Sequence, residues 1–426
     1  MRAHSLPGRR AVRVACGCLL ALFVPLAAAQ RAPQRGAAAP RRPAVTDTAY
    51  YFSEFIFAPH PKHNHSSCIV QAANGDLLAC WYRGSGERTA NDVAIMGSRK
   101  RAGASSWEEP FVMADTPNFP DCNPILFIDP QGTLHLFWQV ILDGQWSGAV
   151  MRTRRSRDYL GDGPPKWSWQ DDLFMPIPPG FADSARAEID RMIAAMPADR
   201  PRREEGLARL QQRRAGIDSQ PLRLVLGWQA RLHPMMYTPT KMLVPLAGNI
   251  GSGICAITED WGATWRMSMP MPGMGGSQPA LVRKADGTLV AYLRHSRRTY
   301  MSTSSDGGET WTPSVPTDQL NPGSSVEVVG LRNGHWIMVH NDTDRGKGRY
   351  RLAIRVSTDE GATWGPARYL ENDPEPTEGD PVEYSYPSLI QAADGRLHVT
   401  HTWRKQGFGE CIKHVVIDER WITEPH

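Results

Sequence analysis

Long hydrophobic runs, a strong excess of one charge and metal-type cysteine spacings are missing from most of this 426-residue sequence. Its 48 Lys and Arg side chains nearly balance 44 Asp and Glu, for a net charge of +4, so no strongly basic surface for nucleic acid is predicted. A hydrophobic fraction of 41% with 22% charged residues excludes a disordered chain and a multi-span membrane protein. Helical patterns are scarce too, whereas 38 Gly, 35 Pro and 14 Trp favour short strands and tight turns. An all-β fold is therefore expected.

The one long apolar run lies at the N-terminus. Arginines between Arg2 and Arg13 precede apolar residues 14–29, which contain Pro25 and end in three alanines. This pattern is typical of a secretory signal peptide over 1–29 rather than of a membrane span. The Ala-, Pro- and Arg-rich stretch 30–46 cannot bury a core, so we expect a flexible leader there and a folded unit over 47–426. The mature chain is expected to be periplasmic or extracellular, with no membrane span.

Cysteine is scarce in the predicted mature chain. The five that remain have no zinc-type spacing, so neither a metal site nor a cofactor is predicted; they are Cys68, Cys80, Cys122, Cys255 and Cys411. Cys68 and Cys80 flank a predicted hairpin turn and are expected to face each other, which would allow a disulfide in an oxidising compartment. The alternative is that all five are small buried hydrophobic side chains.

What the sequence does contain is a repeat. An eight-residue pattern, Ser/Thr-x-Asp-x-Gly-x-Thr-Trp, occurs at 258–265, 304–311 and 357–364, and weaker relatives end at Trp107 and Trp167. The Asp carboxylate can accept backbone N–H groups of a tight turn, Gly allows a positive φ, and Trp packs the turn onto its own sheet. Each copy therefore predicts a hairpin.

A second hairpin signal alternates with the first. It is an Asn/Asp/Gln-Gly pair before alternating apolar residues, and it occurs at 74–75, 131–132, 286–287, 333–334 and 394–395, with a weaker turn at 240–241. Two hairpins per repeat make a four-stranded sheet, and six such repeats predict a six-bladed β-propeller. Residues 183–214, rich in Ala, Arg and Glu, predict a helical insertion in the third blade. We interpret it as a solvated excursion, with a substrate lid as the alternative.

The eight-residue pattern resembles the Asp-box of BNR repeats, and residues 50–426 resemble the sialidase (neuraminidase) superfamily of six-bladed propellers. This resemblance implies a site in which three arginines hold a substrate carboxylate, a Tyr is the nucleophile, a Glu activates it and an Asp is the acid/base. By their offsets from the turns, Tyr386 matches the nucleophile, Arg294 the second arginine and Arg349 the third, with Arg351 competing for the last place.

Other positions depart from the superfamily pattern, as in a sialidase-like branch that lacks the first arginine and the activating Glu. His65 stands at the first arginine position, and Gln278 stands where the activating Glu is expected. An amide cannot take the phenolic proton as a carboxylate does. The acid/base Asp falls in a loop where Glu87 or Asp92 could replace it. His65 is a candidate catalytic group because histidine titrates near neutrality, and a hydrogen-bonded core histidine is the alternative.

Four further polar residues are candidates for holding the sugar. Arg231 begins the third repeat and could supply the third cation, since a guanidinium fork binds both carboxylate oxygens. A structural ion pair is the alternative for each arginine. Asp121, Asn123 and Glu327 begin the second and fifth repeats, where they could bind sugar hydroxyls or cap strand ends.

Three functions are consistent with the sequence. A glycoside hydrolase would use Tyr386 as nucleophile or to stabilise an oxocarbenium-like transition state, with Glu87 or Asp92 as the acid. A polysaccharide lyase acting on a uronate would use His65 or Tyr386 to remove the proton α to the carboxylate, and it needs no activating Glu. A non-catalytic glycan-binding propeller is the third. The leading hypothesis is a secreted, monomeric hydrolase whose partner is a glycan with a terminal acidic sugar of the sialic acid, Kdo or uronate type.

Overall fold

The described part of the chain lies within the compact unit Val45–His426. The computed structural model describes residues 48–199, 202–248, 250–273, 276–377 and 382–424. The predicted signal peptide over 1–29 and the predicted leader over 30–46 lie outside these residues. Within the described ranges, no helix is both long enough and apolar enough to span a bilayer.

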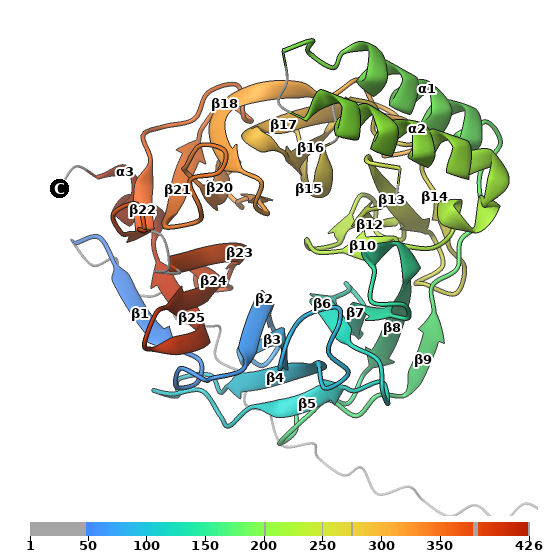
Figure 1. The fold of residues 1–426 in the computed structure, drawn as a ribbon. Coiled ribbons are helices and arrows are strands. Elements are labelled where there is room, and N and C mark those ends of the chain that lie inside the picture. Colours follow the sequence, from blue (N-terminus) through green and yellow to red (C-terminus); the bar gives the residue numbers. More distant parts are fainter. Residues whose placement is uncertain (1–47, 200–201, 249, 274–275, 378–381, 425–426) are drawn as a thin grey trace, which may run out of the picture. The chain divides into compact units, whose positions relative to one another are not determined.

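Six antiparallel sheets are arranged in a ring, one for each predicted repeat (Figure 1). The first three blades are β2 (His63–Gln71), β3 (Leu77–Gly84), β4 (Ala94–Lys100) and β5 (Phe111–Ala114); β6 (Asp121–Ile128), β7 (Leu134–Ile141), β8 (Ala149–Ser156) and β9 (Trp169–Asp172); and β10 (Gln229–Ala230), β11 (Met235–Met236), β12 (Met242–Ala247), β13 (Gly253–Thr258) and β14 (Arg266–Met267). The last three are β15 (Ser277–Arg283), β16 (Leu289–Arg294), β17 (Ser296–Ser304) and β18 (Val315–Pro322); β19 (Glu327–Gly330), β20 (Trp336–Asn341), β21 (Arg351–Ser357) and β22 (Arg368–Asn372); and β23 (Val382–Gln391), β24 (Leu397–Lys405), β25 (Gly409–Ile417) and β1 (Tyr51–Phe55). The all-β, six-bladed propeller prediction is confirmed.

The ring is closed by a strand from the beginning of the described chain. β1 pairs antiparallel with β25, in a register that runs from Tyr51 opposite Ile417 to Phe55 opposite Lys413. The outermost strand of the sixth blade therefore comes from the other end of the sequence. This pairing completes the four-stranded sixth sheet and joins the two ends of the described chain in one blade, and the repeat count alone did not predict it.

The predicted turns lie where the repeat requires them. The Asn/Asp/Gln-Gly pairs join the first and second strands of their blades, and the eight-residue pattern joins the third and fourth. In all three copies the Asp accepts the backbone N–H of the Thr four residues later, Thr264 to Asp260 and Thr363 to Asp359 at 2.8 Å and Thr310 to Asp306 at 3.1 Å. These hydrogen bonds are the reason that the pattern folds as a compact turn.

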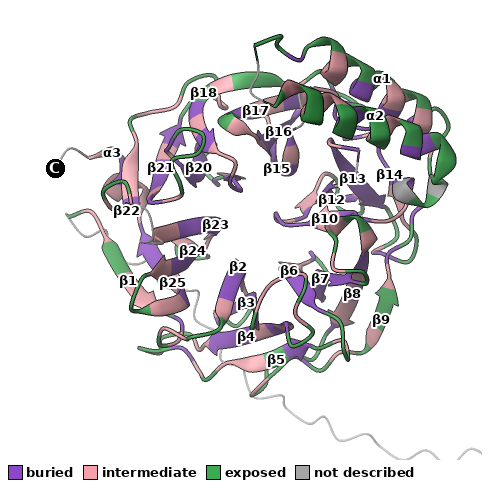
Figure 2. Cartoon of the chain, viewed as in Figure 1, coloured by how far each residue is buried: buried purple, intermediate pink, exposed green. Residues whose placement is uncertain are grey.

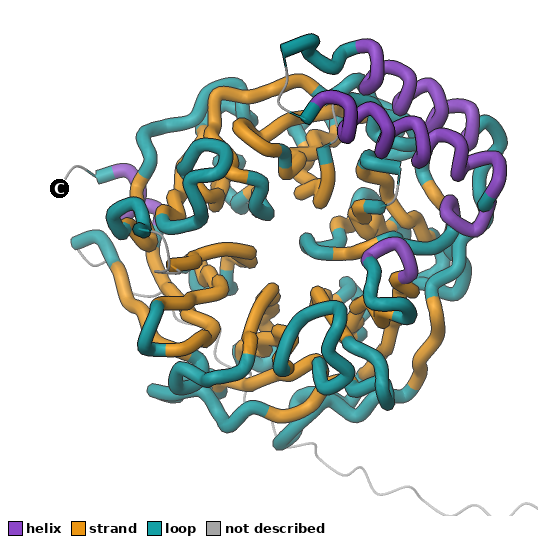
Figure 3. The backbone as a smooth tube through the Cα atoms, in the orientation of Figure 1, coloured by secondary structure: helices purple, strands orange, loops and turns teal. Residues whose placement is uncertain are grey.

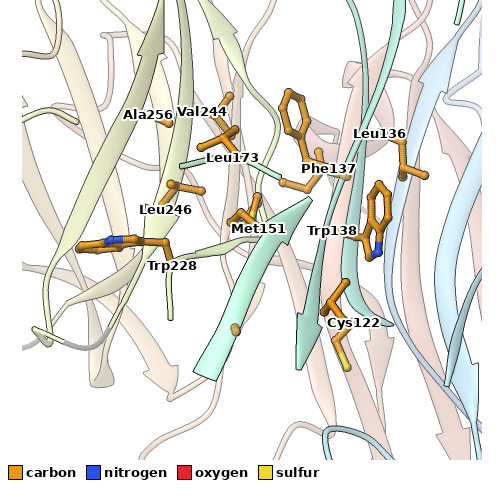
Figure 4. Close-up of a cluster of buried hydrophobic side chains, with 14 of the residues drawn as sticks. Cys122, Leu136, Phe137, Trp138, Met151, Leu173, Trp228, Val244, Leu246 and Ala256 are labelled. Carbon is orange, nitrogen blue, oxygen red and sulfur yellow. The ribbon is translucent and has the colours of Figure 1, made fainter. Parts of the chain in front are cut away.

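The hydrophobic core lies between neighbouring blades. Figure 2 shows that buried residues gather in the inner and middle strands, whereas outer strands such as β1 are largely exposed. Figure 4 shows part of the core between the second and third blades, where Phe137 and Met151 lie near Val244 and Leu246. Burying such side chains is the main stabilising contribution of each blade contact.

The helical insertion comes between β9 and β10, so it precedes the third sheet rather than interrupting it. It consists of α1 (Phe181–Ala194), α2 (Arg203–Ser219) and the short turn η2 (Pro221–Leu224), and the two helices run side by side at the outside of the ring (Figure 3). Two further short helices are η1 (Trp146–Gly148) and α3 (Glu419–Thr423). Phe181, Ile189 and Leu210 are buried in the core cluster that contains the second and third blades. The insertion therefore packs one face on the propeller, and the expectation of a merely solvated excursion is revised.

The cysteines bear out the plainer of the two expectations. Cys68 and Cys80 are directly opposite each other in the β2–β3 ladder, as the hairpin predicted. All five cysteines in the described part are nevertheless free thiols, and all are buried. Most of them act as small hydrophobic side chains of the core. Cys68 differs, because its Sγ also lies 3.3 Å from His233 Nε2.

We expect Trp311→Ala to lower the free energy of unfolding by about 3 kcal/mol, measured by urea denaturation. Trp311 is only 7% exposed and packs against Leu243 and Leu289. Phe174→Ala is a matched control, because Phe174 is 60% exposed and should contribute less than about 0.5 kcal/mol. Equal unfolding curves for the two variants would contradict the role assigned to the Asp-box Trp.

Candidate functional site

A β-bulge recurs in the first strand of four blades. The bulges in β2, β6, β15 and β23 each contain a non-glycine residue with positive φ: Ser66 at 62°, Asn123 at 46°, Gln278 at 50° and Tyr386 at 53°. The last three each precede a Pro, which has no N–H to donate to the ladder. Bulges redirect side chains, and strained backbone of this kind gathers at functional sites. The repeated bulge therefore marks one end of the inner strands as the candidate site.

A pocket of about 500 Å³ opens at this end of the strands. It is lined by His63, His65, Glu87, Asn123, Trp146, Gln229, Ala247, Gly248, Ser277, Gln278, Arg294, Arg349, Glu383 and Tyr386. Seven of the residues predicted from the sequence are among them, namely His65, Glu87, Asn123, Gln278, Arg294, Arg349 and Tyr386. No residue of α1 or α2 belongs to this lining, so a substrate lid made by the insertion finds no support.

Tyr386 lies at the centre of the positive charges. Arg294 donates through Nη1 to the Tyr386 hydroxyl at 2.9 Å and to Gln278 Oε1 at 3.3 Å. The guanidinium carbon of Arg349 lies 5.3 Å from the centre of the Tyr386 ring. Burial of the phenol opposes its ionisation, but the charges of Arg294 and Arg349 outweigh burial and lower the pKa of Tyr386 below its usual value. The arginines thus favour the phenolate without a carboxylate base at Gln278.

The two pocket arginines differ in their pairing. Arg349 donates to Glu383 Oε1 at 2.7 Å, so its charge is partly neutralised. Among the described residues, no carboxylate forms a salt bridge with Arg294, whose hydrogen-bond partners are the Gln278 amide oxygen and the Tyr386 phenol. Arg294 is therefore the better placed of the two to bind an incoming carboxylate.

Glu383 is held as a carboxylate by its surroundings. Burial alone would raise its pKa, but the Arg349 ion pair and a hydrogen bond from Ser385 Oγ at 2.6 Å lower it to about 2. Glu383 was not predicted as a pocket residue. In a regular strand Glu383 and Tyr386 point to opposite faces, and only the bulge between Ser385 and Ser388 changes that alternation.

This pKa predicts a specific pH dependence for stability. Because the folded pKa of about 2 is below the usual 4.5, the contribution of Glu383 is complete above about pH 4.5 and is lost as the pH falls towards 2. Between pH 4.5 and pH 2, the unfolding free energy of the wild type should therefore fall by about 3 kcal/mol more than that of Glu383→Gln. Urea denaturation at several pH values measures it, with the exposed Glu375→Gln as control. Parallel profiles for wild type and Glu383→Gln would contradict it.

Two histidines of β2, His63 and His65, line the same pocket as Tyr386 and Glu383. His65 is 5% exposed, and its ring centre lies 4.3 Å from that of Tyr386. Burial lowers the pKa of His65 well below its usual value, so the ring is neutral. His63 is stacked on His65, and although burial opposes its charge, the hydrogen bond with Glu410 raises its pKa. His63 was not predicted, although strand alternation places it on the same face as His65.

Two candidate carboxylates lie outside the pocket. Asp92 accepts Lys62 Nζ at 2.8 Å and the backbone N–H of Ser85 at 2.9 Å, and these bonds strongly lower its pKa. It fixes its own loop as a carboxylate and is not placed to donate a proton, which leaves Glu87 as the acid candidate. Asp121 is fully buried and accepts Trp138 Nε1 at 2.7 Å and Thr116. It therefore holds the strand end, as the capping alternative proposed.

Arg231 and Glu327 lie deeper than expected. Arg231 is 1% exposed, donates to Pro387 O at 2.9 Å, and lies 5.0 Å from the centre of the Tyr386 ring. It adds positive charge behind the tyrosine but does not line the pocket. Glu327 is 2% exposed, contacts His233 and lines a separate pocket of about 610 Å³. Direct contact of either residue with a sugar in the first pocket is not supported by its position.

The structure distinguishes the two arginines that compete for the third arginine position. Arg349 lines the pocket, whereas Arg351 does not and lies against the Tyr350 ring.

In the part of the chain that the structure describes, no group of three or more His, Cys, Asp or Glu side chains could hold a metal ion. The site is thus built from two arginines, a tyrosine, two carboxylates and two histidines.

Comparison with solved structures shows the same fold. A protein of unknown function from Dyadobacter fermentans aligns with a TM-score of 0.61 at 16% identity, covering 86% of this chain and 97% of the other. The leech intramolecular trans-sialidase, complexed with 2,7-anhydro-Neu5Ac, aligns with a TM-score of 0.61 at 13% identity, over 87% and 71% of the two chains. The intramolecular trans-sialidase of Ruminococcus gnavus, in complex with oseltamivir carboxylate, gives 0.59 at 11%, over 87% and 98%.

Sequence comparison identifies the family. No curated protein matches this chain at a significant level. The sequence profile of the BNR repeat-like domain, in contrast, matches residues 75–182 and 222–399, which is more than half of the chain. The two matched segments are interrupted by the helical insertion. Together with the sialidase-like propeller, this match shows that the chain belongs to the BNR repeat-like domain family.

Proposed function

We propose that this protein is an exported, monomeric glycoside hydrolase that removes a terminal acidic sugar from a glycan. The observation that carries the proposal is the convergence of Tyr386, Arg294 and Arg349, from three different blades, on one pocket with a direct Arg294–Tyr386 hydrogen bond. A volume of about 500 Å³ is within the range of small-ligand sites. Sialidases among the proteins of similar fold support the chemical class.

In the proposed reaction, Arg294 binds the sugar carboxylate through its guanidinium fork. The Tyr386 phenolate then attacks the anomeric carbon or stabilises the positive charge that develops there. Glu87 donates a proton to the departing glycosidic oxygen and, as a carboxylate, next activates a water molecule. Asn123 and Gln278, both turned into the pocket by bulges, are proposed to bind sugar hydroxyls.

A lyase acting on a uronate is the second candidate. The observation in its favour is that Tyr386 is flanked by arginines and neutral His65, with an amide where a hydrolase of this type would place a glutamate. In this reaction the arginines would neutralise the uronate, and the Tyr386 phenolate would remove the proton α to its carboxylate. The carbon–carbon double bond forms as the bond from the β carbon to the glycosidic oxygen breaks, and the Tyr386 hydroxyl so formed gives the proton to that oxygen. Export and the monomeric state are equally part of both proposals.

Mass analysis of products distinguishes the candidates. The protein is incubated with sialylated, Kdo-containing and uronate-containing glycans. A plain reducing sugar supports the hydrolase, whereas an unsaturated uronate supports the lyase and overturns the hydrolase. Intact glycan together with a thermal shift on addition of the free acidic sugar would leave a binding protein and overturn both enzymes.

A further inference from the structure

A chain of hydrogen bonds leads away from Glu87 into the first and sixth blades. The Tyr82 hydroxyl on β3 donates to Glu87 Oε1 at 2.7 Å and lies 3.2 Å from Nε2 of His63 on β2. His63 Nδ1 in turn lies 2.6 Å from Glu410 Oε2 on β25. Glu87 and His63 both line the pocket, and Tyr82 is fully buried. No role was predicted for His63, Tyr82 or Glu410.

Glu410, at the far end of this hydrogen-bond chain, is held in place by further contacts. Glu410 also accepts the backbone N–H of Asn64 at 2.9 Å, and Arg404 lies 3.3 Å from its other oxygen. A carboxylate held in this way requires a proton on His63 Nδ1. The remaining ring nitrogen, Nε2, is therefore the one that can gain or lose a proton.

The Tyr82 hydroxyl has only one hydrogen, so the protons can be placed along the hydrogen-bond chain of His63, Tyr82 and Glu87 in two ways. If Tyr82 donates to a Glu87 carboxylate, its oxygen can accept only from a protonated His63. If Tyr82 donates instead to a neutral His63, its oxygen can accept from a protonated Glu87. The two arrangements contain the same number of protons and differ by the transfer of one along the chain.

We propose that Glu410, His63 and Tyr82 form a relay that supplies the proton of the acid Glu87. His63 Nε2 gives its proton to the Tyr82 oxygen while the Tyr82 hydroxyl proton passes to Glu87 Oε1. Glu87 gives it to the glycosidic oxygen and becomes a carboxylate, and solvent protonates His63 again. The role of Glu87 as acid rests on the proposed function, whereas the relay itself does not.

Other ionisable groups face His63 and set the background for its titration. On its own strand His65 stacks at 5.1 Å, and on β23 Glu383 contributes negative charge. Glu410 on β25, Tyr82 on β3 and Glu87 on the following loop also face it, and Arg404 lies beside Glu410. The net effect is to raise the pKa of His63 although burial opposes it. This keeps a proton available for transfer near neutral pH.

The test is an NMR titration of the His63 ring in the full chain, with its signal assigned by loss in His63→Gln. We expect Glu87→Gln to lower the pKa of His63 by at least about 0.5 in the wild-type background. In the Tyr82→Phe background the same substitution should lower it by less than half as much, because the connecting hydroxyl is absent. Equal decreases in both backgrounds would mean direct charge interaction and would overturn the relay.

Two further variants serve as controls for this NMR titration. Tyr369→Phe removes a hydroxyl that donates to Asp342 at 2.8 Å outside the pocket, and it should leave the Glu87→Gln effect on His63 unchanged. If Tyr82→Phe does not fold, Glu410→Gln replaces it: loss of this carboxylate should lower the pKa of His63 by more than loss of Glu87 does. A smaller decrease would overturn the relay.

A leaving-group comparison separates this proposal from the proposed function. An aryl sialoside leaves without protonation, whereas a galactosyl-linked sialoside needs an acid. Tyr82→Phe should lower the ratio of kcat/KM for the galactosyl over the aryl substrate by about tenfold or more. An unchanged ratio would overturn the relay as a catalytic device. If the wild type cleaves neither substrate while the NMR coupling is present, the proposed hydrolase fails and the relay stands.

Discussion

Replacing Tyr386 with Phe is expected to lower kcat/KM by at least about a thousandfold, a loss of about 4 kcal/mol in transition-state stabilisation. The substitution removes one oxygen atom, and that oxygen accepts the Arg294 hydrogen bond at 2.9 Å. As a nucleophile or as a base, Tyr386 acts through this atom, so the hydrolase and the lyase both predict the loss. Activity is measured on an aryl glycoside of sialic acid and on a uronate glycan.

Tyr384→Phe is the matched control for this prediction. Tyr384 is two residues earlier in β23, and its hydroxyl donates to Asp373 at 2.6 Å, away from the pocket. It should keep kcat/KM within about threefold of the wild type. The difference absorbance of the phenolate gives a second readout: one tyrosine should ionise below the usual pKa in the wild type and in Tyr384→Phe, but not in Tyr386→Phe. Less than a tenfold loss in Tyr386→Phe would contradict its catalytic role.

The fold could be predicted because its signals are local. Each hairpin depends on a few turn residues, such as Asp260 and Thr264, whose hydrogen bonds span four positions. The closure by β1 has no such signal, because Tyr51–Phe55 pairs with a strand at the other end of the chain. The two-residue strands β10 and β11 are also too short to produce an alternating pattern. Long-range pairing and very short strands were therefore the features that sequence reasoning could not supply.

The site could be predicted only in part, for a related reason. Offsets from the turns placed Arg294, Arg349 and Tyr386 in one pocket, because the turns fix the register of each strand. Burial depth is not encoded by offset, and Arg231 lies behind the Tyr386 ring instead of beside it. Glu383 was missed because a bulge, invisible in a regular two-residue alternation, brings it to the same face as Tyr386. A Pro within the first strand of a blade, such as Pro387 after Tyr386, is the sequence signal that would have indicated the bulge.

Under the proposed function, the electrostatics of the pocket explain how Tyr386 could act without a glutamate at position 278. A carboxylate there would take the phenolic proton, whereas Gln278 only accepts a hydrogen bond from Arg294 at 3.3 Å. In its place Arg294 and Arg349 stabilise the phenolate directly, and buried Arg231 adds to their charge from behind. Each arginine lowers the free energy of the ionised phenol, so removal of one should affect both substrate binding and Tyr386.

Arg294→Ala is therefore expected to lower kcat/KM by about a hundredfold, close to 3 kcal/mol, through two losses at once. The substrate carboxylate loses its charge-assisted partner, and the Tyr386 phenolate loses its hydrogen bond, so the pKa of Tyr386 should rise. Arg298→Ala is the matched control, because Arg298 lies in the same blade, is exposed and donates to Asp318 O outside the pocket. A thermal shift with free acidic sugar separates the two losses: binding should weaken in Arg294→Ala but not in Tyr386→Phe. If Arg294→Ala binds the acidic sugar as well as the wild type does, Arg294 does not hold the carboxylate, and its remaining role is to stabilise the phenolate.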